Sequence, residues 1–128
     1  MRKLTTFKVY VLDQENARKF YVDQLGFHVA EDKRMGDYRW LLVQPPDTPE
    51  VTINLEIART ADEKGLVGRQ AAGQPLFGLG TDDCMRDYRE LKGRGVKFEG
   101  EPKVQAWGTG VMLEDLYGNK IYLSQEPA

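Results

Sequence analysis

The stretch WGTGVMLEDLYGNKIYL, residues 107–123, decides the fold that we expect for this chain. Apolar residues alternate with polar or flexible ones on both sides of Gly118-Asn119, namely Val111 and Leu113 before the pair and Ile121 and Leu123 after it. This alternation predicts a β-hairpin with Gly118-Asn119 at its turn, because Gly and Asn tolerate the positive φ angles that tight hairpin turns require. One face of the hairpin is expected to pack on a core, and the other presents a polar series to a cavity: Lys120, Tyr122 and Ser124.

The length and the charge of the chain exclude several classes of protein. Its 128 residues, 41% hydrophobic and 30% charged, fit one ordinary domain that can bury a core. A net charge of -2 leaves no broad basic field for a nucleic-acid backbone. No apolar run approaches the length of a membrane span, and the start MRKLTTFKVYV lacks the apolar core of a signal peptide. We therefore expect a cytoplasmic protein with no nucleic-acid or membrane partner.

Cysteine and histidine each occur once. Cys84 cannot form an internal disulfide, which fits a reducing compartment, and we expect it to be a small residue in the first turn of a helix. His28 is expected to be exposed or at an interface. Catalytic sites for zinc, nickel or iron usually take one or more imidazoles alongside carboxylates, and this chain offers only one.

Working outward from the hairpin, the same order of elements is predicted twice. Strands are expected at 4–12, 27–35, 38–43, 50–58, 76–81 and 96–98 from their apolar alternation. Helices are expected to begin after Asp13 and Asp83, whose carboxylates can cap free backbone amides, and to end at Gly26 and Gly95. Residues 59–73 carry charges, small residues and glycines, and are interpreted as a linker with room for a short helical turn.

The two halves form an internal repeat. Asp13 and Asp83 are offset by 70 residues, Gly26 and Gly95 by 69, and the triplets Ile53-Asn54-Leu55 and Ile121-Tyr122-Leu123 by 68. Each half is then a strand-helix-three-strand unit with a helix on one face of its sheet. The other face is bare unless it curls around a ligand or a partner.

Three segments carry a resemblance to a known family: VLDQENARKFYVDQLGF at 11–27, TDDCMRDYRELKGRGVKF at 81–98, and the hairpin at 107–123. The chain resembles the vicinal oxygen chelate superfamily of glyoxalase I, bleomycin-resistance proteins, fosfomycin-resistance enzymes and extradiol dioxygenases. MGDYRWLLVQPP at 35–46 looks like an uncharacterised bacterial glyoxalase-like subgroup. The resemblance implies an α+β fold in which two βαβββ modules form an incomplete barrel, and commonly a homodimer. The whole chain, 1–128, would be one such domain, with module 1 at about 4–58, the linker at 59–73 and module 2 at about 74–125.

The resemblance also bears on metal binding. Members that use a metal take ligands from four equivalent strand positions, usually His or Glu, and these correspond here to Thr6, Asn54, Leu76 and Tyr122. None of these is an ordinary ligand. Glu56 reaches the same face two residues further along, yet one carboxylate does not make a catalytic metal site. We therefore expect no metal cofactor and no metal-dependent glyoxalase chemistry.

Without a metal, the cavity face offers polar and aromatic side chains. Lys8 and Glu56 are either a structural ion pair, or an anion anchor and a base. The tyrosines and tryptophans are either ligand contacts or packing at the wall and at interfaces. The candidate ligand-binding set is Thr6, Lys8, Tyr10, Trp40, Asn54, Leu76, Trp107 and Tyr122.

Three functions remain open on this basis. The first is metal-independent binding of an aromatic or drug-like small molecule, by analogy with bleomycin resistance through sequestration. The second is an enzyme, a glyoxalase-type lyase or isomerase that uses an atypical metal site or acid-base catalysis by Glu56 and Tyr122. The third is a regulatory or structural dimer with no small ligand.

Overall fold

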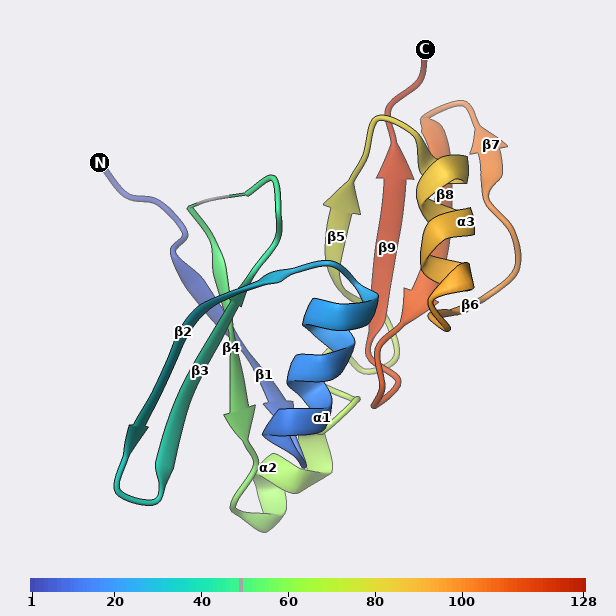
Figure 1. The fold of residues 1–128 in the computed structure, drawn as a ribbon. Coiled ribbons are helices and arrows are strands. Elements are labelled where there is room, and N and C mark those ends of the chain that lie inside the picture. The colour runs from blue at the N-terminus through green and yellow to red at the C-terminus, as the bar shows by residue number, and fades with distance from the viewer. Residues whose placement is uncertain (49) are drawn as a thin grey trace. The chain divides into compact units, whose positions relative to one another are not determined.

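The structure is a computed structural model that describes residues 1–48 and 50–128. The chain divides into two compact units, Met1–Gly68 and Arg69–Ala128. Each unit has its own sheet, of four strands in the first and five in the second (Figure 1). Neither sheet closes on itself within the described residues. The architecture is therefore the α+β class that the sequence predicted.

The first unit is a mixed sheet with strand order β1-β4-β3-β2. Its strands are β1 (Thr6–Val11), β2 (His28–Met35), β3 (Tyr38–Gln44) and β4 (Thr52–Ile57). Strands β1 and β4 run parallel to each other, whereas β4 with β3 and β3 with β2 are antiparallel pairs. All four strands were predicted, with ends that differ by one or two residues.

The helical segment of this unit contains α1 (Gln14–Arg18) and a π-helical segment, η1 (Lys19–Gln24). The Asp13 carboxylate accepts a hydrogen bond from the Asn16 amide, as expected for the cap, and Gly26 has a φ of 87° where the segment ends. The predicted helical segment is therefore present up to this glycine, but its second half is π-helical, with the Leu25 amide bonding the Phe20 carbonyl. The linker also contains a short helix, α2 (Ala61–Leu66).

Arg39 ties this helical segment to the sheet. It lies on the opposite face of β3 from Tyr38 and Trp40, as the alternation predicted, and only 9% of its surface is exposed. Its guanidinium donates to Asp32 at 2.8 Å and to Glu15 of α1 at 3.2 Å. Two carboxylates thus satisfy a cation that would otherwise be costly to bury.

The second unit repeats the plan with order β5-β9-β8-β6, and β7 also pairs with β8. Its elements are β5 (Pro75–Gly80), α3 (Cys84–Gly93), β6 (Lys97–Phe98), β7 (Lys103–Gln105), β8 (Gly108–Glu114) and β9 (Lys120–Gln125). Cys84 is fully buried at the first position of α3, as expected, and Asp83 caps the helix by accepting from the Arg86 amide. His28, in the first unit, is exposed.

The hairpin that decided the fold is present, but its turn differs from the prediction. Glu114 pairs with Lys120, so residues 115–119 form a five-residue loop and not a tight two-residue turn. Gly118 has a φ of 90°, whereas Asn119 is not among the residues with positive φ. Asn119 is buried instead, and its backbone and side-chain amides both donate to the Asp115 carboxylate. A carboxylate therefore shapes this loop.

The sequence repeat is preserved in the strand register. Phe7 pairs with Ile53 in the first sheet, and Phe77 pairs with Ile121 in the second. The same offsets relate the pair Val9 and Leu55 to the pair Leu79 and Leu123. The two units are therefore copies of one plan, down to which residues face each other across the parallel strands.

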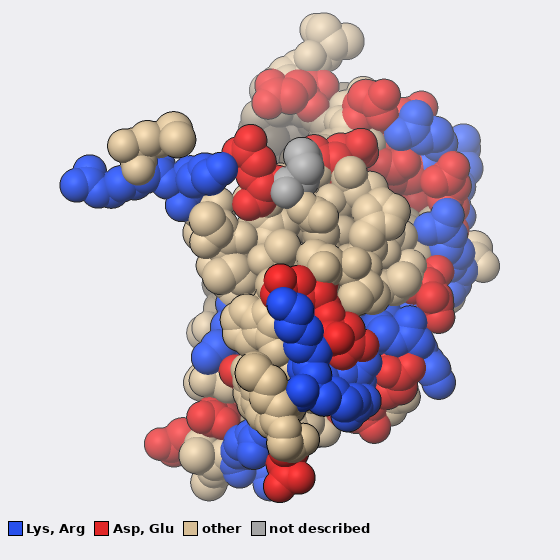
Figure 2. All heavy atoms as spheres, turned by 60° about the vertical axis from the view of Figure 1, so that its left-hand side comes forward, with Lys and Arg blue, Asp and Glu red and all other residues tan. Residues whose placement is uncertain are grey.

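Basic and acidic side chains are interspersed on the face shown in Figure 2. Among the described residues, no helix is long and apolar enough to cross a membrane.

Candidate functional site

Two surfaces hold the polar and aromatic residues that the sequence singled out, one in each unit. The first, which we call the β4 face, consists of Lys8, Tyr38, Asn54 and Glu56 in the first unit. The second, the β9 hollow, is a depression in the second unit beside Tyr122.

The β4 face is organised around the Glu56 carboxylate. Its Oε2 accepts a hydrogen bond from the Tyr38 hydroxyl at 3.0 Å and lies 3.7 Å from the Lys8 ammonium. The Lys8 side chain is 46% exposed and that of Glu56 only 15%. The Arg59 guanidinium lies over the Tyr38 ring, 5.7 Å from its centroid. The ion pair of Lys8 and Glu56, one of the two alternatives that the sequence left open, is therefore present, and Tyr38 is added to it.

Tyr38 links the carboxylate to Asn54. Burial raises the pKa of Tyr38, and the hydrogen bond to Glu56 raises it further, so the hydroxyl stays protonated. Asn54 also forms a side-chain hydrogen bond to Tyr38. Since the Tyr38 proton is donated to Glu56, the hydroxyl oxygen accepts from the Asn54 amide nitrogen.

Two side-chain oxygens of the β4 face have no hydrogen-bond donor among the residues that the structure describes. The Asn54 Oδ1 and the Glu56 Oε1 are both buried, and neither has a hydrogen-bond partner within the described part of the chain. Asn54 as a whole is 5% exposed. Buried polar atoms are nearly always paired, so these two acceptors mark a place where donors are missing.

The other candidates of the first unit lie around this cluster. Thr6 pairs with Thr52 and Tyr10 with Glu56 across β1 and β4, which places them on the same face of the sheet. Trp40 lies on the same face of β3 as Tyr38, and its indole nitrogen donates to Glu31 at 2.7 Å. The first unit therefore brings together Thr6, Lys8, Tyr10, Trp40, Asn54 and Glu56.

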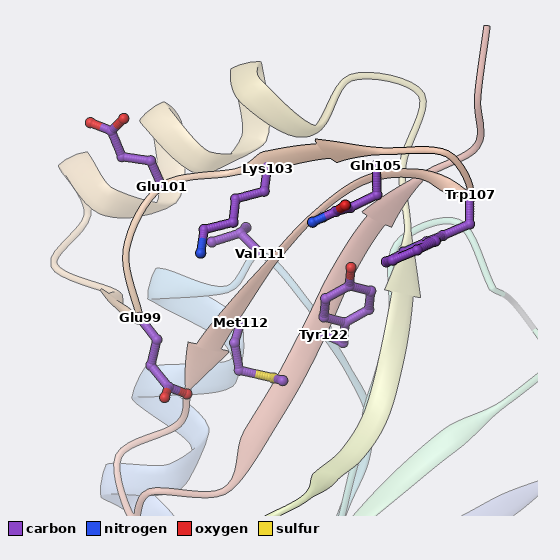
Figure 3. A pocket seen from close by; sticks show the side chains of 9 residues that line it. Glu99, Glu101, Lys103, Gln105, Trp107, Val111, Met112 and Tyr122 are labelled. Carbon is purple, nitrogen blue, oxygen red and sulfur yellow. The ribbon is translucent and has the colours of Figure 1, made fainter.

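The β9 hollow has a volume of about 180 Å³. Strands β7, β8 and β9 and the segments beside them supply its walls, including Glu99, Lys103, Gln105, Trp107, Met112 and Tyr122. Gln105, Trp107 and Tyr122 come together at one end, and Lys103, Met112 and Glu99 lie toward the other (Figure 3). The hollow thus has an aromatic end and a charged end.

Tyr122 owes its position to a glycine. A Cβ atom at Gly110 would overlap the Tyr122 hydroxyl and ring, so the ring lies against the bare backbone of β8. Trp107 precedes that strand and is 70% exposed, which is unusual for so large an apolar side chain. These two predicted residues therefore line one depression. The third candidate of this unit, Leu76, is half-buried at the irregular step of β5 between Pro75 and Phe77.

Comparisons with known proteins identify the family. The profile of the Glyoxalase/Bleomycin resistance protein/Dioxygenase superfamily matches residues 3–123, nearly the whole chain. This chain belongs to that superfamily. An uncharacterized protein of Shewanella frigidimarina is 39% identical over 111 residues, which are 85% of this chain and 82% of that protein.

Two solved structures are also similar over nearly their full length. UcmS2 has a TM-score of 0.86 and 32% identity, over 97% of this chain and 98% of that one. TnmS3, an antibiotic binding protein from Streptomyces sp. CB03234, has a TM-score of 0.82 and 32% identity, over 99% of this chain and 98% of that one.

The superfamily resemblance implies a divalent metal for some members, and the residues of this chain do not fit one. The resemblance assigns Thr6, Asn54, Leu76 and Tyr122 to the four ligand positions, and the leucine side chain has no donor atom. The Glu56 carboxylate, two residues from Asn54 on β4, already has the Lys8 ammonium beside it. Among the described residues, no three His, Cys, Asp or Glu side chains gather where they could hold a metal ion.

Sequence reasoning placed Tyr38 on one strand face with Trp40 but did not predict its bond to Glu56, and it missed Lys103, Gln105 and Met112 in the β9 hollow. The pairing of β3 with β4 would have pointed to the Tyr38 contact, since both strands and their alternation were predicted. Lys103 and Gln105 belong to β7, a strand of three exposed residues whose sequence carries no alternating apolar signal.

Proposed function

We propose that this protein binds an aromatic or drug-like small molecule without a metal ion, and that the β9 hollow receives an aromatic part of the ligand. The observation that carries the proposal is the exposed Trp107 beside Tyr122 in that hollow. Large aromatic surfaces next to a depression stack well on planar ligands. The similarity to TnmS3, an antibiotic binding protein, supports the same function.

The size of the hollow limits what it can take. Ligand pockets usually measure roughly 300–1,000 Å³, and a cavity of roughly 150 Å³ holds one benzene ring. At about 180 Å³, the β9 hollow accommodates one ring and leaves the rest of a larger ligand outside. The ligand therefore needs further contacts beyond this hollow.

Calorimetric titration with a panel of aromatic antibiotics tests the proposal. Trp107→Ala is expected to weaken the affinity for a compound that binds by about tenfold or more, since a buried aromatic contact contributes more than 1 kcal/mol to binding. Val104→Ala is the matched control, because Val104 is 83% exposed on β7 and does not line the hollow. Equal losses in both variants, or no binding by any compound in the panel, would refute the proposal.

A second candidate function is supported by one specific observation. The Glu56 Oε1 has no partner among the described residues, and a carboxylate oxygen without a donor can accept a proton from a substrate. This favours a glyoxalase-type lyase or isomerase with Glu56 as base. Glu56 and the other suggested catalytic residue, Tyr122, lie in different units. Glu56→Gln separates the two functions: an enzyme would lose turnover by orders of magnitude and keep its ligand, whereas a binding protein would change only in affinity.

The proposal includes a cytoplasmic homodimer. The family resemblance supports the dimer, and the single free thiol of Cys84 supports a reducing compartment. Sedimentation velocity over a range of protein concentrations tests the dimer, and a mass of one chain throughout would contradict it.

A further inference from the structure

The two unpartnered oxygens of the β4 face require an explanation of their own. Asn54 and Glu56 are two residues apart on β4, so their side chains project from the same face of the sheet. Both leave one buried oxygen without a donor. A buried acceptor that has lost water and gained no partner destabilises the folded protein.

The surrounding groups do not supply the missing donors. The Tyr38 hydroxyl has one proton, which is donated to the Glu56 Oε2. The Lys8 ammonium lies 3.7 Å from that same Oε2. The Asn54 side chain bonds the Tyr38 hydroxyl, and its Oδ1 has no partner among the described residues. The arrangement therefore presents two acceptors to whatever occupies the space beside them.

We propose that the β4 face is a recognition site for a ligand that donates two hydrogen bonds, one to the Asn54 Oδ1 and one to the Glu56 Oε1. The ligand class is an aromatic compound with two hydroxyl or N–H groups. This inference rests on the proposed function, since it specifies the chemistry of a small molecule that the protein binds. It concerns the first unit and adds a site to the aromatic contacts of the β9 hollow.

Other occupants fit the chemistry less well. A metal ion would need more oxygens than two, and the Lys8 ammonium and the Arg59 guanidinium already bring positive charge to the cluster. An anion or an ether has no proton to donate, so its oxygen lone pairs would face those of the Asn54 and Glu56 oxygens and be repelled by them. A hydrogen-bond donor on the ligand binds these acceptors favourably, because the acceptors are already dehydrated and held in place by their neighbours, so that binding costs no further free energy to dehydrate or order them.

The strand geometry sets the spacing of the donors. Side chains two residues apart on a strand start about 6–7 Å from each other, because each residue adds about 3.3 Å. Hydroxyls on opposite sides of a fused ring system match this spacing better than two hydroxyls on adjacent carbons. Lys8 gives access to the site, since its side chain is long, 46% exposed and able to swing away from the carboxylate.

The free protein provides the first test. Asn54→Leu replaces an amide whose oxygen is unpaired among the described residues with an apolar group of similar size. It also removes the bond from the amide nitrogen to Tyr38, but the Tyr38 hydroxyl keeps Glu56 as its acceptor. Removal of the dehydrated oxygen is expected to outweigh that loss and to raise the melting temperature by about 3 °C. Asn119→Leu is the matched control: Asn119 is also buried, at 3% exposed, but its amide donates to Asp115 at 2.8 Å. That variant is expected to melt at least about 5 °C lower. A fall for both variants would mean that Asn54 Oδ1 is already paired, by an ordered water only, and would overturn the proposal.

Ligand binding provides the second test, with 2,7-dihydroxynaphthalene and its dimethyl ether as probes. Calorimetry is expected to show at least about tenfold tighter binding of the diol than of the ether to the unaltered protein, and a clearly smaller preference in Asn54→Leu, which keeps only the Glu56 acceptor. Equal affinities in the unaltered protein, no binding of the diol, or an undiminished preference in Asn54→Leu would overturn the inference. The proposed function fails separately, through the antibiotic panel and Trp107→Ala, whatever the diol does.

Discussion

Replacing Gly110 with alanine tests how the β9 hollow is built. Gly110 lies on β8, diagonally across from Tyr122 on β9, and the tyrosine ring occupies the space that a Cβ atom would need. The backbone of Gly110 has no positive φ, so alanine is not excluded by its conformation. The whole effect of the substitution should therefore come from the collision with Tyr122, which must swing out of its place and into the hollow.

The magnitude follows from two opposing contributions. Overpacking typically costs about 1–3 kcal/mol, and alanine in place of glycine in a strand recovers about 0.5–1 kcal/mol. We expect a net loss of about 1 kcal/mol, which lowers the melting temperature of a chain of this size by about 3–5 °C. A displaced Tyr122 also narrows the hollow, so any ligand that stacks on Trp107 should bind about tenfold more weakly or worse.

Circular dichroism melting curves and calorimetric titrations measure both effects, with Gly78→Ala as the control. Gly78 faces Tyr122 from the other neighbouring strand, and a Cβ atom there meets only a backbone oxygen at an ordinary 3.6 Å. This control is expected to be neutral or slightly stabilising. If Gly110→Ala melts and binds like Gly78→Ala, Tyr122 does not lie over Gly110, and the description of the hollow is wrong.

Three further predictions concern the fold. Asp83→Ala removes a helix cap and should cost about 1 kcal/mol of unfolding free energy in urea titrations, whereas Asp82→Ala, which removes an exposed ion pair, should cost less than half of that. Arg39 holds the pKa of Asp32 below its ordinary value of 3.8. The ion pair therefore contributes to the unfolding free energy at a pH above 3.8, and this contribution is lost as the pH falls through the lowered pKa. In Arg39→Met the unfolding free energy should fall less steeply with pH over this range, and an unchanged slope would contradict the assignment. Cys84 is fully buried and burial raises its pKa, so a thiol reagent should label it only at the rate at which the protein opens; rapid labelling under native conditions would contradict its burial.

The fold was predictable because it rests on local patterns that repeat. The period-two alternation of the strands, the caps at Asp13 and Asp83 and the glycines at 26 and 95 act over a few residues each, and the internal repeat checks them against each other. The errors lie where tertiary contacts override local preference. Asn119 looked like a turn residue with positive φ, yet its side chain is buried against Asp115 and fixes a longer loop.

The candidate site was predictable as a face, and less so as a set of interactions. Alternation placed Lys8, Asn54 and Glu56 on one side of the sheet, which their register confirms. The same alternation gives no information on which side-chain oxygens have a hydrogen-bond donor. That depends on Tyr38, which reaches across from β3 and takes up one oxygen of Glu56. To assign a partner to each hydrogen-bonding group, one needs the positions of atoms on several strands, and a pattern along one strand does not give these positions.

The repeat explains why the two units differ in chemistry although they share a backbone plan. Asn54 and Tyr122 stand at equivalent positions, yet Asn54 pairs with Lys8 and Tyr122 pairs with Gly78. The tyrosine ring fits because Gly110 on β8 leaves room for it, whereas a Cβ atom at Gly78 would meet only a backbone oxygen, at 3.6 Å. An exchange of side chains between the units is therefore not neutral. A tyrosine at 54 would have the Lys8 side chain beside it, whereas Tyr122 is paired with a glycine. An asparagine at 122 would leave the bare backbone of β8 uncovered. The repeat provides one scaffold twice, and the residues beside the central position determine that one copy presents hydrogen-bond acceptors and the other an aromatic surface.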